Sequence, residues 1–276
     1  MQIKNFPVNS KNSYVVFENN DKIEELEPFM KENKLSRVIF SGFLGYSKSV
    51  LPFNNDIDVI EEITIQCSNI TDLTPLYHLS NIKKISIEEN AALAHPFDIR
   101  KIAQLTDFFT DDTLKIDGFF DHPTLKQLHI EPKKTKKLDI HNENNILESL
   151  SIANSHILDL SDCKKLTNLK GLYIAYLSKI EDIDFILDMP TLTDIEICSC
   201  KKIDNLIATL AQKNNLEKLT LWNQGNLDSI IPLSKLEHLI TLNIWEQTKI
   251  IDGKISFLEE MPNLKKIDIR KYTYYH

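Results

Sequence analysis

The sequence predicts an α/β fold, a curved solenoid with a parallel β-sheet on its concave face and short helices, 3₁₀ turns and loops on its convex face. An apolar-x-x-apolar-x-apolar pattern occurs eleven times in 276 residues, and successive copies begin 20 to 25 residues apart. A second pattern, with apolar residues every three positions, follows several copies and is typical of a short helix or 3₁₀ turn. Units of about 20 to 50 residues that repeat in this way stack into solenoids.

The copies are regular enough to be numbered. With the first apolar residue as position 1, core side chains fall at positions 1, 4 and 6. Of these 33 positions 32 are apolar and one is Thr110, whereas a 42% apolar composition would fill fewer than half by chance. The copies begin at Leu35, Ile60, Ile82, Leu105, Leu125, Leu147, Leu169, Leu192, Leu216, Leu239 and Leu264.

The segments between the copies carry helix signals of their own. Pro75, Pro96 and Pro232 are expected to begin short helices, because the first helical position needs no N–H. Asp21 and Glu24 suggest a capping box at the start of an earlier helix. The predicted domains are an N-terminal cap grown from a degenerate repeat (1–34), a solenoid of about eleven repeats (35–270) and an aromatic C-terminal tail (271–276).

Composition excludes several classes of protein. The chain has 40 Asp+Glu against 32 Lys+Arg, a net charge of −8, which argues against nucleic acid as a partner. Four scattered cysteines indicate a reducing compartment. With no apolar run near the ~20 residues that cross a bilayer, and no apolar region of a signal peptide, we expect a cytoplasmic protein without a membrane partner.

The sequence holds no catalytic or metal-binding spacing. The loop from Gly42 to Ser49 lacks the second glycine of a phosphate loop. Cys198 and Cys200 form one isolated pair, in which Cys198 is expected on the concave face and Cys200 inside. Carboxylate pairs on an open, solvated sheet are expected to lack the burial that shifts pKa values. We therefore expect no enzyme activity, no metal and no cofactor.

The concave face carries the candidate binding residues, because positions 3, 5 and 7 point there. Trp222 and Trp245 share position 7 of neighbouring copies. Either the rings merely cover one another, or they form a binding hot spot, where Trp and Tyr are enriched. The acids between residues 62 and 131 favour a partner with a basic surface. The predicted partner-binding residues are Phe109, Tyr173, Tyr176, Asp194, Glu196, Trp222, Asn243, Trp245, Glu62, Glu88, Asp107 and Glu131.

The repeats resemble a known family. The eleven-fold pattern, and the stretch from Ile63 to Leu76 in particular, resembles the leucine-rich repeat family and its internalin-like bacterial subclass. The resemblance covers about residues 35–270. In that family an Asn occupies the ninth position, which Asn90 holds here and Cys200 replaces once. The resemblance implies a solenoid whose concave face presents binding residues.

These observations predict a non-catalytic module that binds another protein, and they leave its role open. A cytosolic bacterial protein with this face would fit an immunity or inhibitor protein that occludes a basic toxin. An effector or surface protein that binds a host molecule would need an export route, and an intracellular scaffold would bind several partners. An uncapped edge after the last repeat could also pair with a second copy.

The inward and outward assignments can be tested by stability alone. Leu172→Ala or Leu219→Ala should lower the free energy of unfolding by about 2–5 kcal/mol, because each opens a cavity in the core. Trp222→Ala and Trp245→Ala should change it little. Urea unfolding of the four variants measures this, and equal losses at both kinds of position would contradict the assignment.

Overall fold

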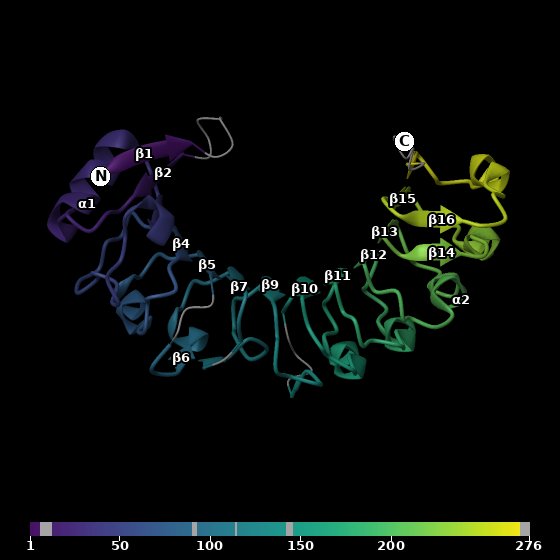
Figure 1. Ribbon diagram of the computed structural model, residues 1–276, viewed down its shortest axis with the longest axis horizontal. Helices are drawn as coiled ribbons and strands as arrows, with labels where there is room; N and C mark the ends of the chain where they lie inside the picture. The colour runs from purple at the N-terminus through teal and green to yellow at the C-terminus, as the bar shows by residue number, and fades with distance from the viewer. Residues whose placement is uncertain (6–12, 90–92, 114, 142–145, 271–276) are drawn as a thin grey trace. The chain divides into compact units, whose positions relative to one another are not determined.

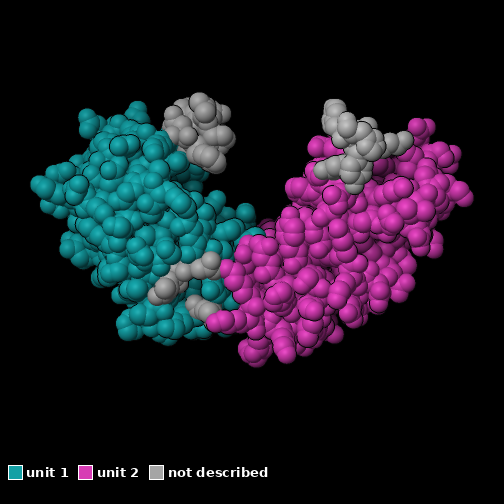
Figure 2. Space-filling view, in the orientation of Figure 1, with its two compact units in different colours: residues 1–130 teal, residues 131–276 magenta. Residues whose placement is uncertain are grey.

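The structure is a computed structural model that describes residues 1–5, 13–89, 93–113, 115–141 and 146–270. The chain forms two compact units, residues 1–130 and residues 131–276 (Figure 2). The repeat spacing does not indicate this division, since copies on either side of it begin 22 residues apart, at Leu125 and Leu147. Asn90 and the predicted tail at 271–276 lie outside the described residues.

The first unit is built on a sheet of order β1-β2-β3-β4-β5-β7-β9, in which β1 pairs antiparallel with β2 and the following described strands pair in parallel. Two short strands, β6 and β8, pair beside it. Its elements are β1 (Gln2–Asn5), β2 (Ser13–Val16), α1 (Ile23–Asn33), β3 (Arg37–Ser41), η2 (Gly42–Leu44), β4 (Glu62–Gln66), η3 (Thr74–His78), β5 (Lys84–Glu88), β6 (Phe97–Asp98), η4 (Ile99–Lys101), β7 (Asp107–Thr110), β8 (Ile116–Asp117) and β9 (Gln127–Ile130).

The second unit has a parallel sheet in the order β10-β11-β12-β13-β15-β17, and β14 pairs with β16 on the connecting side. In each unit the long strands stand along one side and the 3₁₀ turns along the other (Figure 1). The elements are β10 (Ser149–Ala153), η5 (Ser161–Lys165), β11 (Gly171–Ala175), η6 (Asp184–Asp188), β12 (Asp194–Cys198), α2 (Leu206–Leu210), β13 (Lys218–Trp222), β14 (Gly225–Leu227), η7 (Ile231–Lys235), β15 (Thr241–Trp245), β16 (Thr248–Ile250), η8 (Ser256–Glu260) and β17 (Lys266–Ile269).

Each of the eleven copies forms one strand that begins at position 3. Positions 4 and 6 of neighbouring strands are paired in register, as Leu219 with Leu242 and Leu221 with Ile244. The core side chains are buried throughout, except Leu35 in the first copy and the three of the last copy, where Ile267 is 43% exposed. The polar exception, Thr110, is also buried, and its hydroxyl donates to the backbone oxygen of Asp112 at 2.6 Å.

A repeated pair of backbone hydrogen bonds joins each copy to the next. The carbonyl at position 2 of one copy accepts two N–H groups, those of positions 2 and 3 of the next copy. Thr193 O, for example, accepts from Glu217 N at 2.8 Å and Lys218 N at 3.0 Å. The same two bonds recur at most junctions within each unit. The forked bond marks where each strand enters the sheet, and the buried side chains at positions 4 and 6 set its register.

The chain leaves each strand by a recurring turn at positions 8 and 9. Position 8 has a positive φ in six copies, the residues being Glu89, Asn154, Tyr176, Ser199, Asn223 and Glu246. The side chain at position 9 turns inward and bonds to backbone carbonyls. Ser155 Oγ donates to Pro132 O at 2.7 Å, and Gln224 Nε2 donates to Ile197 O at 2.7 Å. Cys200 is 1% exposed, as predicted, and its thiol donates to Cys198 O at 3.3 Å.

The connecting segments differ from expectation at two places. Pro75 and Pro232 lie in the first turn of η3 and η7 as predicted, but Pro96 precedes the strand β6 instead of a helix. The expected capping box is wrong, because α1 begins after Lys22, which makes no side-chain cap. Asp21 accepts the backbone N–H of Glu18 at 2.8 Å instead. Among the described residues no helix is both long and apolar enough to span a bilayer.

One buried histidine makes the first unit sensitive to pH. His122 is 4% exposed; its Nε2 faces the Ile102 carbonyl oxygen at 3.1 Å and its Nδ1 accepts the Thr124 N–H at 3.2 Å. This arrangement holds the neutral imidazole, with the proton on Nε2. Burial lowers the pKa of His122 below its usual 6.5.

The free energy of unfolding should therefore fall as the pH drops below 6.5. There the unfolded chain binds a proton at His122 that the folded chain does not bind, until the pH reaches the lowered pKa. His122→Asn should flatten this dependence in urea unfolding between pH 7.5 and 5.5. His156→Asn, at an exposed histidine, is the control, and an unchanged profile for His122→Asn would contradict the prediction.

Candidate functional site

The face of the second unit's sheet that bears positions 3, 5 and 7 is here named the open face. Its side chains form rows across the strands, because the strands are in register. Row 7 runs Ala153, Ala175, Cys198, Trp222, Trp245 and Arg270. Row 5 runs Ser151, Tyr173, Glu196, Thr220, Asn243 and Asp268.

Row 7 ends in two tryptophans and an arginine. Trp222 pairs in register with Trp245, and their rings meet edge to face with centroids 6.2 Å apart. Trp222 is 36% exposed and Trp245 is half-buried. The Arg270 guanidinium carbon lies 4.9 Å from the Trp245 ring centroid. Both Nε and Nη2 of Arg270 also donate to Asp268, at 3.2 and 3.0 Å. The structure therefore keeps both indoles on the open face, with the Arg270 guanidinium over the second one.

Tyr173 lies down along its own strand over Gly171. A methyl group on Gly171 would come within 2.8 Å of the Tyr173 hydroxyl oxygen. The phenol is thus directed toward Asp194, which pairs in register with Gly171. Burial, and next the charge of Asp194, raises the pKa of Tyr173 to about 12. Asp194 also forms an ion pair with Lys218 at 3.4 Å.

Glu196 corrects the expectation that acids on this sheet keep ordinary pKa values. Its carboxylate is half-buried, and burial together with the charge of Asp194 raises its pKa. Unlike Asp194, it has no hydrogen-bond donor or cation of the described chain against it. A desolvated and unpaired charge of this kind is unfavourable in the free protein.

Three further residues close to the tryptophans, two of them predicted to bind the partner, differ from one another in exposure. Tyr176, at position 8, is 54% exposed, and the nearby Cys198 thiol raises the pKa of its hydroxyl. Cys198 stands on the expected face of the sheet but is only 5% exposed, so its thiol is not accessible there. Asn243, one of the predicted partner-binding residues, is only 8% exposed and donates to Thr220 Oγ1 at 3.0 Å. Its amide therefore bonds to the neighbouring strand and is not presented to a partner.

The acids predicted in the first unit already have partners there. Glu62 Oε1 binds Arg37 Nη2 at 2.8 Å. Glu88 accepts hydrogen bonds from the side chains of Gln66 and Ser86, at 2.7 and 2.9 Å. Asp107 accepts one from Thr106 Oγ1 at 2.7 Å.

The remaining two predicted residues are also engaged. The Phe109 ring stacks on His129, with centroids 4.2 Å apart. Glu131, in the second unit, accepts a hydrogen bond from Asn154 Nδ2 at 2.6 Å. The structure thus brings Tyr173, Glu196, Trp222 and Trp245 together on neighbouring strands. The predicted acids that precede them in the chain, from Glu62 to Glu131, have partners within the protein.

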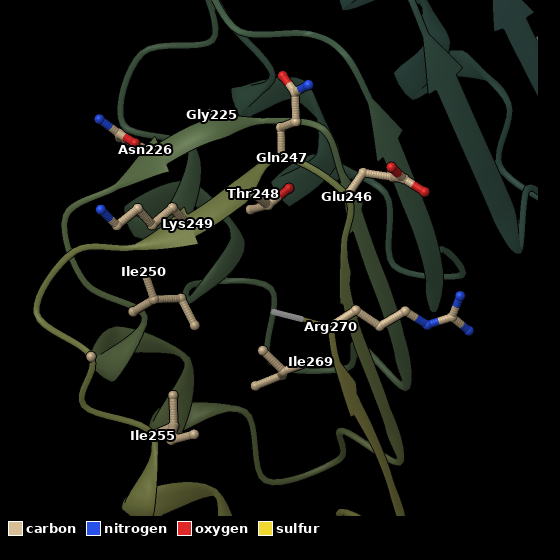
Figure 3. A pocket seen from close by; sticks show the side chains of 11 residues that line it. Gly225, Asn226, Glu246, Gln247, Thr248, Lys249, Ile250, Ile255, Ile269 and Arg270 are labelled. Carbon is tan, nitrogen blue, oxygen red and sulfur yellow. The ribbon is translucent and has the colours of Figure 1, made fainter. Parts of the chain in front are cut away.

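A pocket of about 750 Å³ opens beside the last repeat of the second unit (Figure 3). Lys249 and Ile250 of β16 and Ile255 line one side, and Arg270 and Glu246 line the other. Thr248 Oγ1 within it accepts the Gln224 N–H at 3.0 Å. Arg270 is thus shared between this pocket and row 7. No group of three His, Cys, Asp or Glu arranged for a metal occurs in the described ranges.

Two residues that shape the site were absent from the predicted set. Arg270 stands at position 7 of the last copy, so the repeat numbering alone places it beside Trp245. Gly171 is a glycine inside a strand two residues before a tyrosine, a pattern that often marks the close approach of another group.

The packing of Tyr173 on Gly171 gives a test of the site geometry. Gly171→Ala should displace the ring, cost about 1 kcal/mol of stability through overpacking, and lower the pKa of Tyr173 from about 12 toward its usual 10. Titration of the Tyr173 ring carbon by NMR measures this. Gly42→Ala, where the nearest atom would be 3.7 Å away, is the control. An unchanged Tyr173 pKa would show that the ring does not lie over Gly171.

Comparison with known proteins finds similar structures only. No protein-family model matches the chain, and no curated protein matches its sequence. Three internalin structures of Listeria monocytogenes are similar at low identity. InlF is 14% identical, with a TM-score of 0.44 and coverage of 77% of this chain and 76% of that one. The InlJ functional domain is 16% identical, with a TM-score of 0.47 and coverage of 94% of this chain and 59% of that one. Internalin C2 is also 16% identical, with a TM-score of 0.36 and coverage of 65% of this chain and 71% of that one.

The fold follows from the chain's own repeats. Every copy of the apolar pattern begins a parallel strand at position 3, and the segment after it returns on the other side of the sheet. The residue at position 9 bonds to backbone carbonyls in three copies of the second unit. With this architecture, each unit has the fold that the repeat pattern predicts, a leucine-rich repeat solenoid.

Proposed function

We propose that the protein is a non-catalytic binding module whose open face in the second unit anchors another protein. The observation that carries the proposal is the exposed Trp222 ring, held edge to face by Trp245, which is itself covered by Arg270. Trp, Tyr and Arg are the residues most enriched in binding hot spots. Here they occur together on a surface whose side chains the fold does not require.

The contacts among these side chains support a binding role. The rings belong to neighbouring strands held by a continuous ladder, and Arg270 is fixed by two hydrogen bonds to Asp268. Side chains that are already ordered lose little conformational entropy on association. Tyr176, Asn223 and Glu246 follow row 7 at position 8 and supply polar groups beside the rings, as the periphery of an interface requires.

Within this function we propose a partner with a basic surface, and specifically an inhibitory role against a basic toxin in the cytoplasm. The net charge of −8 supports the partner class, because opposite charge speeds encounter. The four cysteines, all free and buried, are consistent with a reducing compartment. An inhibitor of this kind acts by covering the toxin's working surface and needs no chemistry of its own.

The proposal predicts that a partner captured from the native cell by the wild-type protein is lost with Trp222→Ala. The loss should be about 2 kcal/mol or more for Trp222→Ala and for Trp245→Ala, measured as Kd by calorimetry with the purified partner. Leu158→Ala is the matched control, since Leu158 is 52% exposed outside the open face. A partner that binds all variants equally would contradict the site, and a partner with an acidic surface would contradict the partner class.

A further inference from the structure

The two tryptophans are flanked by two carboxylates in a nearly symmetric way. Asp268 lies in row 5, one strand beyond Trp245, and Glu196 lies in row 5, one strand before Trp222. On the Asp268 side an arginine completes the arrangement, because Arg270 lies over the Trp245 ring and binds Asp268 through Nε and Nη2. On the Glu196 side the matching position in row 7 is Cys198, which carries no charge.

The Glu196 side therefore lacks the cation that the Asp268 side has. Glu196 is half-buried without a donor from the described chain, and Trp222 is the more exposed of the two indoles. Tyr176, 54% exposed beside Cys198, borders the same place. Neighbouring strands are about 4.8 Å apart and residues two apart along a strand about 6.6 Å. A guanidinium can span this distance, contacting an indole while it pairs with a carboxylate.

We propose that an arginine side chain of the protein partner binds over Cys198, stacks against Trp222 and pairs with Glu196. This inference rests on the proposed binding function and names the group that the surface recognises. Arginine fits better than lysine because its planar guanidinium stacks on aromatic rings and presents a fork to a carboxylate. Arg270 makes the same two contacts at the other end of the row.

The experiment begins with a selection of peptides displayed on phage against the full chain, followed by counter-selection against Trp222→Ala. Selected peptides are synthesised with arginine, and again with citrulline, which has nearly the same shape and no charge. Dissociation constants are measured for the wild type, Trp222→Ala, Glu196→Gln and Glu237→Gln. The last variant is the matched control, since Glu237 is exposed in a connecting segment of the same unit.

The inference is supported if the peptides carry an arginine whose replacement by citrulline weakens binding about tenfold or more. Glu196→Gln and Trp222→Ala should weaken binding by a similar factor, and Glu237→Gln should not. If binding needs Trp222 but is indifferent to citrulline and to Glu196→Gln, the arginine inference is wrong and the proposed function stands. If no recovered peptide depends on Trp222, both are wrong.

A partner-free measurement separates recognition from a structural role. An unpaired, half-buried carboxylate opposes folding, so Glu196→Gln should leave the urea midpoint at pH 7 unchanged or raise it. A lower midpoint would mean that Glu196 has an internal partner, and the inference would then fail. Trp222→Ala should also keep a near wild-type midpoint, which ensures that lost binding is not lost folding.

Discussion

The constraint on which the structure depends is the strand register that buries positions 4 and 6 in every copy but the last. One carbonyl per copy accepts two N–H groups of the next, so each strand enters the sheet at a fixed place. A slip of one residue would exchange the inward and outward faces. Because the register holds, leucines and isoleucines at positions 4 and 6 stack into one core per unit, and the alternate residues form rows on the open face. No copy could bury its apolar side chains alone, so each copy becomes stable only by stacking on its neighbours.

The same constraint explains how much the sequence could predict. Core positions and strand starts follow from local pattern, and even the alignment of Trp222 with Trp245 follows from counting. Contacts between outward side chains do not. The approach of Arg270 to Trp245 and the rotation of Tyr173 onto Gly171 depend on rotamers. The internal partners of Glu62 and Glu88 likewise come from neighbouring strands, which a count of charges cannot reveal.

The corrections have a common physical origin, which is that neighbours on a sheet bury one another. Asn243 and Cys198 occupy outward positions, yet they are only 8% and 5% exposed. Glu196 is desolvated in the same way, and this changes its electrostatics although it stands on an open surface. Alternation along a strand therefore predicts the direction of a side chain, whereas its exposure also depends on its neighbours across the strands. The division at residue 130 has no counterpart in the repeat spacing.

The left-handed residue at position 8 has a consequence for the margin of the binding face. Its N–H continues the ladder past the strand, as Asn223 N does to Trp245 O at 3.2 Å. Non-glycine residues pay roughly 1 kcal/mol for this conformation, so six copies tolerate a strain that glycine would remove. What they gain is a side chain projected sideways at every turn. One backbone geometry thus places a row of polar side chains, those of Tyr176, Ser199, Asn223 and Glu246, directly after the aromatic row.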